Sequence, residues 1–216
     1  MKLYIYEHCP FCARARMIFG LKNILVEQHV LLSDDNQSPI SMIGEKMVPI
    51  LQKDDGSFMP ESLDIVSYVD NNYGDKPILT GVRSSKITEL IQQIQQYDYR
   101  LECPRYIKMN LLEFSTQNAI DDFVTSKANK MDSFADCLVQ SDTLISAVSK
   151  LFDKLELLII SPNACNGTLS LDDILLFPTL RNLTCVKDLV FPKKIKAYLQ
   201  QMAKQSKVDL FFDRAI

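Results

Sequence analysis

The chain has 216 residues, enough for one large domain or two small ones, and 47% of them are hydrophobic, as in an ordinary globular protein. Its net charge of −3 argues against a nucleic-acid-binding protein, because such proteins depend on a basic excess. No stretch is apolar for long enough to span a bilayer and no signal segment opens the chain, so we expect a cytoplasmic protein that does not bind membranes.

The first third of the chain reads as strand, helix, strand, helix, hairpin and helix. Helical spacing begins at Pro10, and Asp55-Gly56 marks a tight turn between two short strands. Ser62 is expected to cap the last helix, whose apolar face would be Leu63, Val66, Tyr68 and Val69. The strands are predicted at 2–6, 26–32, 48–52 and 57–59, and a short helix near 40–44. This order predicts an α/β domain over residues 1–73.

Residues 74–83 are predicted to be a linker, because glycine brackets them and proline interrupts them. Residues 84–216 then follow helical spacing and predict an all-α domain. Pro104 should kink or divide the first long helix, and Ser170 with Asp173 indicates a capping box. Further helices are predicted near 116–129, 133–157, 171–186 and 193–204.

Six cysteines are present, and two of them form a closely spaced pair, Cys9 and Cys12. Because cytosolic thiols are normally kept reduced, a C-x-x-C pair there indicates catalysis or metal binding rather than a structural disulfide. The other cysteines stand singly among apolar neighbours and are expected to be buried: Cys103, Cys137, Cys165 and Cys185.

The position of Pro10 predicts the chemistry of the pair. Proline suits the first helical turn, which places Cys9 at the N-cap and Cys12 one turn inside. Free backbone N–H groups and the helix dipole at that end stabilise a thiolate, and Arg14 and Arg16 are expected to add positive potential. Cys9 is therefore the predicted nucleophile and Cys12 the resolving thiol.

Two other interpretations of the cysteine pair are a zinc site and two buried structural thiols. Structural zinc usually needs a second closely spaced ligand pair, and the chain offers only His8 and His29 besides, so no metal is expected. His8 could act as a base, tune the pKa of Cys9, or be a solvated turn residue. His29 lies within a predicted strand and is expected to have no chemical role.

Two further segments could bind a ligand. Pro49 is either an ordinary trans proline that begins a strand or a cis proline that leaves the backbone of Val48 open to an extended peptide. Ser62 at a helix N-terminus could take a carboxylate, and Glu61 beside it an ammonium group. Alternatively, Ser62 is simply a cap and Glu61 a favourable first-turn charge.

These elements, in this order, resemble the thioredoxin fold as used by glutaredoxins and glutathione transferases. Cys9-Pro10-Phe11-Cys12 is similar to the glutaredoxin C-P-Y-C site, Val48-Pro49 to the family's valine and cis-proline, and Glu61-Ser62 to its glutathione-binding acidic-Ser pair. The helical part looks like the all-α domain of glutathione transferases. Phe11 departs from the pattern, because it lacks the hydroxyl of the usual tyrosine.

The resemblance implies a thioredoxin-like domain joined to a glutathione-transferase-like helical domain. It implies a glutathione-dependent thiol–disulfide oxidoreductase that reduces protein disulfides and glutathionylated thiols, with glutathione as co-substrate and no metal. We expect a monomer, because the sequence shows no feature specific to a dimer. Arg16 or Lys22 would hold the glycyl carboxylate of glutathione. The other implied glutathione contacts are Pro10, Phe11, Val48, Pro49, Glu61 and Ser62.

Two alternative functions remain open at this point. A glutathione transferase would have the same two-domain plan, but a second reactive thiol at Cys12 would form a disulfide rather than activate bound glutathione. A non-catalytic interaction module would keep the fold without needing a thiolate at Cys9.

Overall fold

A four-stranded sheet organises the N-terminal part of the chain. In a computed structural model, which describes residues 1–128 and 130–216, the strands are β1 (Lys2–Ile5), β2 (Glu27–Val30), β3 (Ile50–Gln52) and β4 (Phe58–Met59). They lie in the order β2-β1-β3-β4, with β1 parallel to β2 and antiparallel to β3, and β3 antiparallel to β4. All four predicted strands are confirmed, each shorter than predicted.

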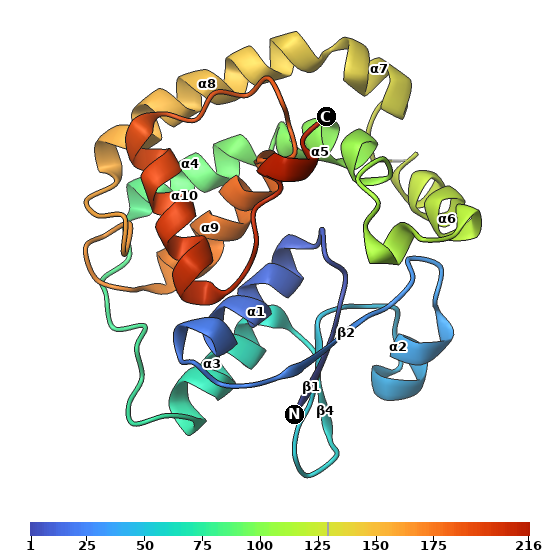
Figure 1. The fold of residues 1–216 in the computed structure, drawn as a ribbon, viewed down its shortest axis with the longest axis vertical. Helices are drawn as coiled ribbons and strands as arrows, with labels where there is room; N and C mark the ends of the chain where they lie inside the picture. Colours follow the sequence, from blue (N-terminus) through green and yellow to red (C-terminus); the bar gives the residue numbers. More distant parts are fainter. Residues whose placement is uncertain (129) are drawn as a thin grey trace.

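Three helices accompany the sheet: α1 (Pro10–Leu21), α2 (Gln37–Ile43) and α3 (Ser62–Asn72). Figure 1 shows α1 and α3 together on one side of the sheet and α2 on the other. Apolar residues of β1 and β3 face the helices, and Leu3, Ile5 and Leu51 are fully buried there. This arrangement places the N-terminus of α1 directly after the loop that leaves β1.

Two details predicted for α3, its N-cap and its buried face, were wrong. Glu61, not Ser62, is the N-cap, and Ser62 is the first helical residue. The buried face is Ile65, Val66 and Val69, whereas Leu63 is 37% exposed. α3 packs mainly against α1, so its buried side is centred on Ile65, Val66 and Val69 and leaves Leu63 at the edge.

The C-terminal part is helical, as predicted. Residues 73–84 form turns and an extended segment that leads into it. The helices are α4 (Ser85–Ile94), α5 (Asp98–Tyr106), α6 (Gln117–Lys127), α7 (Phe134–Val139), α8 (Ser141–Leu158), α9 (Leu171–Leu183) and α10 (Lys193–Ser206), with short 3₁₀ turns η1 (Leu112–Phe114) and η2 (Phe212–Arg214). The predicted helix near 116–129 reaches residue 129, which lies outside the described residues.

Two helix predictions need correction. Pro104 lies inside α5 and does not divide the helix. The break falls at residues 95–97, where the N–H groups of Gln96 and Tyr97 donate to carbonyls three residues back and so tighten the end of α4. The predicted single helix at 133–157 is two helices: α7 ends at Val139, and Gln140 is both its C-cap and the N-cap of α8.

The capping box at the start of α9 is confirmed. Ser170 N donates to Asp173 Oδ2 at 2.9 Å, and Asp172 N donates to Ser170 Oγ at 3.2 Å. Asp173 Oδ1 also accepts hydrogen bonds from Cys165 N and the Tyr198 hydroxyl, at 2.7 and 3.1 Å. The cap therefore anchors α9 to α10 as well as starting the helix.

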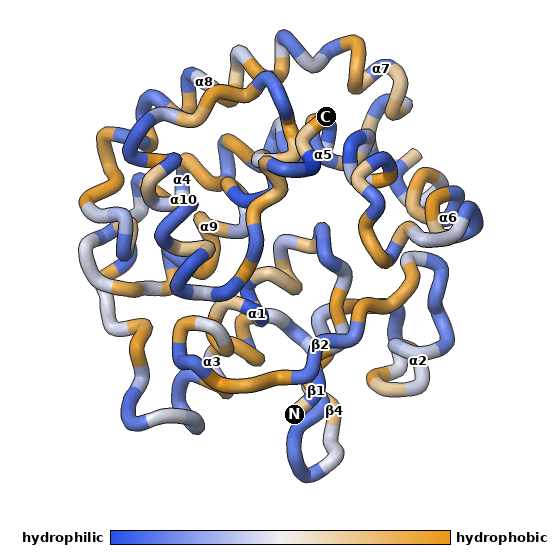
Figure 2. Tube along the Cα trace, viewed as in Figure 1, coloured by the Kyte–Doolittle hydropathy of each residue, from blue (hydrophilic) through white to orange (hydrophobic). Residues whose placement is uncertain are grey.

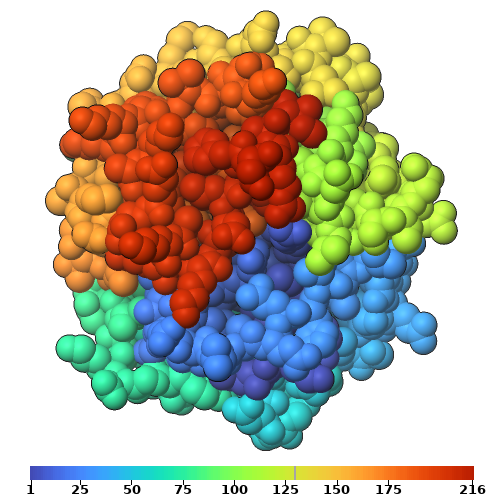
Figure 3. Space-filling model, viewed as in Figure 1, coloured from blue at the N-terminus to red at the C-terminus, as the bar shows by residue number. Residues whose placement is uncertain are grey.

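The two parts of the chain pack along α1. One side of α1 contacts α3, and the other contacts α9 and α10. Apolar and polar residues alternate along the tubes of α6 and α8, which is typical of helices with one buried side (Figure 2). In the space-filling view the C-terminal residues lie directly against the N-terminal part (Figure 3). The helical part thus reaches the end of α1 that carries the cysteine pair.

Candidate active site

The cysteine pair lies at the start of α1, as predicted. Cys9 is the N-cap, Pro10 is in the first turn, and the Cys12 N–H donates to Cys9 Sγ at 3.4 Å. Cys9 is 8% exposed, whereas Cys12 is fully buried and its sulfur accepts from Tyr6 N at 3.4 Å. A substrate approaching from solvent therefore reaches Cys9 first.

The surroundings of Cys9 favour its ionised form. A hydrogen bond from the Cys12 side chain lowers the pKa of Cys9 most strongly, against the opposing effect of burial. The positive charge of His8 and the backbone N–H groups of Cys12 and Phe11 lower it further, to about 7. Among charged side chains, His8 has the largest effect on the pKa of Cys9, and Arg14 also interacts electrostatically with Cys9.

Cys12 has the opposite tendency. Burial raises the pKa of the Cys12 thiol well above its ordinary value, and the hydrogen bond to Cys9 raises it further. Cys12 is therefore protonated while Cys9 is a thiolate. This suits Cys12 to act second, after Cys9 has lost its charge by forming a mixed disulfide.

This difference predicts a selective pH profile for alkylation. Because the thiolate is the reactive form, the rate at which iodoacetamide modifies Cys9 should rise with pH through a midpoint near 7, rather than near the 8.5 or so of an ordinary thiol. Mass spectrometry of the modified peptides would report Cys9 and Cys12 separately. A Cys9 midpoint above about 8 would contradict the assignment.

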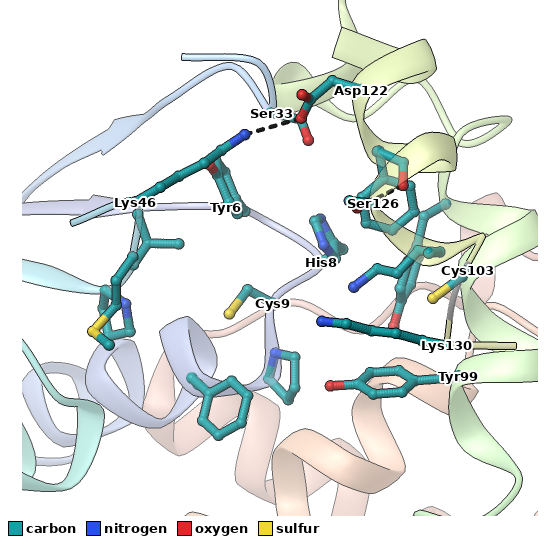
Figure 4. Close-up of a pocket in the computed structure, with 18 of the residues that line it drawn as sticks. Tyr6, His8, Cys9, Ser33, Lys46, Tyr99, Cys103, Asp122, Ser126 and Lys130 are labelled. Carbon is teal, nitrogen blue, oxygen red and sulfur yellow. Dashed lines mark hydrogen bonds and ion pairs between the residues drawn. The ribbon is translucent and has the colours of Figure 1, made fainter. Parts of the chain in front are cut away.

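A cavity of about 750 Å³ opens over Cys9. Figure 4 shows Cys9 at its centre, between the strand loops and the helical part. Of the eight residues predicted for the site, all but the buried Cys12 line this cavity: Cys9, Pro10, Phe11, Val48, Pro49, Glu61 and Ser62. Segments distant in sequence thus meet at one place.

The two predicted ligand-binding segments have distinct backbone conformations. The Val48–Pro49 peptide is cis, which decides between the two interpretations of Pro49. Glu61 has a φ of 67°, in the left-handed region that non-glycine residues rarely adopt. Ser62 is buried, 4% exposed, at the start of α3. Residues with such backbone conformations cluster at active sites and ligand-binding sites.

The helical part supplies a wall of the cavity that was not predicted from the sequence. This wall carries aromatic, hydroxyl and basic side chains: Tyr99, Tyr106, Phe123, Ser126, Lys127 and Lys130. Tyr99 and Lys130 point into the cavity in Figure 4. Across the opening, Lys46 Nζ pairs with Asp122 Oδ2 at 2.9 Å and joins the two parts of the chain. The spacing of Lys127 and Lys130 was a signal, but an ordinary solvated helix face shows the same pattern.

The two cations proposed for the glycyl carboxylate lie elsewhere. Lys22 is at the far end of α1, where its Nζ donates to the Asp70 carboxylate at 3.1 Å and to the Asp70 carbonyl at 2.6 Å. Arg16 and Lys22 are both outside the set of residues that line the cavity. Among the described residues, the lysines that do line it are Lys46, Lys127 and Lys130.

The remaining cysteines are buried, as predicted, and burial raises the pKa of each of them: Cys103, Cys137, Cys165 and Cys185. Across residues 1–128 and 130–216, no group of three or more His, Cys, Asp or Glu side chains could hold a metal ion. Within the same residues, no helix is both long and apolar enough to cross a membrane.

Comparison with known proteins places this site in a family. The model of the glutaredoxin 2 C-terminal domain matches residues 86–215, and that of the glutathione S-transferase N-terminal domain matches residues 3–77. Glutaredoxin 2 of Escherichia coli K12 is 52% identical over 216 residues, with the whole of both chains covered.

Solved structures agree with these matches. The structure of glutaredoxin 2 from Salmonella typhimurium in complex with glutathione is 51% identical, has a TM-score of 0.97, and is matched over 100% of this chain and 98% of that one. A glutathione transferase from Phanerochaete chrysosporium, 15% identical with a TM-score of 0.74 over 97% and 98% of the two chains, shares the fold. With identity above one half along its whole length, this chain belongs to the glutaredoxin 2 family.

Proposed function

We propose that this member of the glutaredoxin 2 family of glutathione-dependent oxidoreductases reduces protein disulfides and glutathionylated thiols through Cys9 and Cys12. The observation that carries the proposal is the asymmetry of the pair. Cys9 faces the cavity with a lowered pKa, and Cys12 lies buried beneath it with a raised one. A nucleophile and a resolving thiol differ in this way.

Removal of glutathione from a protein thiol uses Cys9 alone. The Cys9 thiolate attacks the glutathionyl sulfur, the mixed disulfide breaks, and the protein leaves as a thiolate. The thiolate of a second glutathione then attacks the sulfur of glutathione bound on Cys9. This step forms oxidised glutathione and returns Cys9 as a thiolate.

Reduction of a protein disulfide uses both cysteines. Cys9 attacks one sulfur and releases the first protein thiol, and Cys12 then attacks Cys9, releases the second thiol and closes a Cys9–Cys12 disulfide. One glutathione opens that disulfide by attacking Cys9, and another removes it as oxidised glutathione. Two electrons pass from two glutathione molecules to the substrate.

Glutathione is proposed to lie along the strand side of the cavity. The backbone of Val48, exposed by the cis peptide, would pair with its cysteinyl unit. Its γ-glutamyl end would lie at Glu61 and Ser62, where an acidic side chain meets the N-terminus of α3. Its glycyl carboxylate would face the lysines of the rim, at Lys127 and Lys130. The Salmonella relative was solved in complex with glutathione, which supports glutathione as the ligand.

We further propose that the protein acts as a monomer in the cytoplasm. Its six cysteines are free thiols, which fits a compartment where glutathione keeps thiols reduced.

The substitution Cys12→Ser tests the division of labour. We expect the variant to keep most of its ability to remove glutathione from a glutathionylated protein, because that cycle needs Cys9 alone. Reduction of a protein disulfide should fall by about tenfold or more, because the mixed disulfide on Cys9 must wait for glutathione. Parallel assays on the two substrates measure the split. Equal losses on both would show that Cys12 is not the resolving thiol.

A further inference from the structure

The helical part of the chain holds the residue just before Cys9. The backbone N–H of His8 donates to Glu113 Oε1 at 2.8 Å, and His8 Nδ1 lies 2.7 Å from the same oxygen. Asn182 Nδ2 donates to the His8 carbonyl at 2.7 Å, and Arg181 Nη1 donates to the carbonyl of Glu7 at 3.0 Å. Residues more than 100 positions away therefore fix the segment that delivers the nucleophile.

The Glu113 carboxylate is fully buried, and a buried carboxylate needs a partner of opposite charge. Burial acts to raise the pKa of Glu113, but its hydrogen bonds with His8 and the charge of His8 lower it below its ordinary value. The Glu113–His8 contact thus joins the two parts of the chain, is closed from water on the carboxylate side, and is an ion pair whenever His8 is protonated.

Aromatic rings enclose the His8 imidazole. Their centroids lie 4.8 to 5.8 Å from that of His8, at Tyr6, Tyr106, Phe114 and Phe123. The faces of such rings attract cations, most strongly where water is excluded. The Glu113 carboxylate at His8 Nδ1 and the aromatic rings packed around the imidazole both favour a positive charge on His8.

His8 and Cys9 both line the cavity, and Figure 4 shows them side by side. We propose that the His8–Glu113 ion pair keeps the Cys9 sulfur ionised, so that the helical part of the chain sets the reactivity of the nucleophile. His8 and Glu113 act as positioning residues. This inference rests on the proposed function in that it takes Cys9 as the attacking thiol.

Other ionisable groups around the pair fit this arrangement. Burial raises the pKa of Tyr6 and Tyr106, so both are neutral at physiological pH. Cys12 is held protonated by burial, and Arg16 and Arg181 carry positive charge towards Glu113. His8 therefore contacts the Glu113 carboxylate and directly precedes Cys9 in the chain, so a charge on its ring acts on both groups.

A double-mutant cycle tests the inference through the rate at which iodoacetamide alkylates Cys9. At pH 6, His8→Gln should slow alkylation by about tenfold, because the loss of a nearby positive charge raises the thiol pKa by about one unit. Glu113→Gln keeps an oxygen for the His8 N–H but removes the charge, and it should also slow the alkylation of Cys9. The double variant should be no slower than His8→Gln, because Glu113 acts through His8. At pH 10 all rates should converge.

Asn182→Ala is the matched control. It removes another hydrogen bond to the same residue, the one to the His8 carbonyl, without changing a charge. It should lower the melting temperature and leave the alkylation midpoint in place. His8→Gln and Glu113→Gln each remove the charge interaction between His8 and Glu113, so either variant tests the proposal if it folds. An unchanged midpoint in the folded variants, or an equal shift in Asn182→Ala, would overturn it.

The alkylation assay contains no glutathione and no disulfide. An unchanged alkylation midpoint would exclude the role of His8 and Glu113 and leave the Cys9 mechanism intact. Loss of the Cys9 mechanism would instead appear as reductase activity without Cys9.

Discussion

Cys9→Ser is expected to lower glutathione-dependent reduction of hydroxyethyl disulfide by at least about 1,000-fold. Every proposed cycle begins with the Cys9 thiolate, and a serine hydroxyl cannot form or break a disulfide. Cys12 cannot substitute for it, because Cys12 is fully buried and burial raises the pKa of its thiol. The fold should be unaffected, since serine is itself a favourable N-cap residue.

Cys137→Ser is the control for this prediction. Cys137 is buried far along the chain in α7, and its sulfur contacts the Asp132 carbonyl at 3.6 Å, a contact that a hydroxyl can keep. Activity should therefore remain close to that of the unmodified protein. If Cys9→Ser kept substantial activity, another group would be the nucleophile. Conjugation of glutathione to a chloronitrobenzene by the unmodified protein, at rates above disulfide reduction, would point to transferase chemistry instead.

The parts of the site that sequence could predict are those built by local interactions. Pro10 fits the first turn of a helix and so places its neighbour Cys9 at the N-cap, an inference that needs only adjacent residues. The same holds for the capping box of Ser170 and Asp173, in which both partners lie within one turn. Local geometry of this kind leaves a pattern in the sequence that a reader can recognise.

The parts that sequence could not predict depend on contacts between distant segments. Glu113 lies 105 positions from His8, and nothing around it distinguishes it from a solvated acidic residue. Lys127 and Lys130 line the cavity only because α6 and the residues after it lie against the N-terminal part, where Phe123 packs on His8. Lys22 was proposed as a ligand for a carboxylate, but tertiary packing gives it Asp70 as its partner. Charge alone does not reveal which cation faces a site.

Helix boundaries show the same limit. The periodicity of apolar residues correctly indicated the helical part, but placed one break at Pro104 and none near residue 140. Pro104 lies inside α5, and the helix continues through it to Tyr106. The actual breaks, at 95–97 and 140, carry neither glycine nor proline, so no local residue marks them in the sequence.

The contact between α1 and α10 leads to the second prediction with a large effect, that Gly20→Ala will strongly destabilise the protein. A Cβ atom at Gly20 would lie 1.7 Å from the Ser206 carbonyl oxygen and 2.2 Å from its carbon. Both are backbone atoms at the end of α10, so no side-chain rotation can relieve the overlap. Either α1 and α10 must separate or the last turn of α10 must unwind, at a cost above about 3 kcal/mol.

For a chain of this size, that cost corresponds to a fall in melting temperature of roughly 10 °C, measurable by calorimetry. Gly56→Ala is the matched control, because Gly56 lies in the β3–β4 turn with a φ of 83° and open space around it. There alanine meets the backbone penalty alone, about 1 kcal/mol. Equal melting temperatures for the two variants would contradict the close approach of α10 to α1. A larger fall at Gly20 would instead show that the helical part is held against the helix that carries Cys9 by direct backbone contact.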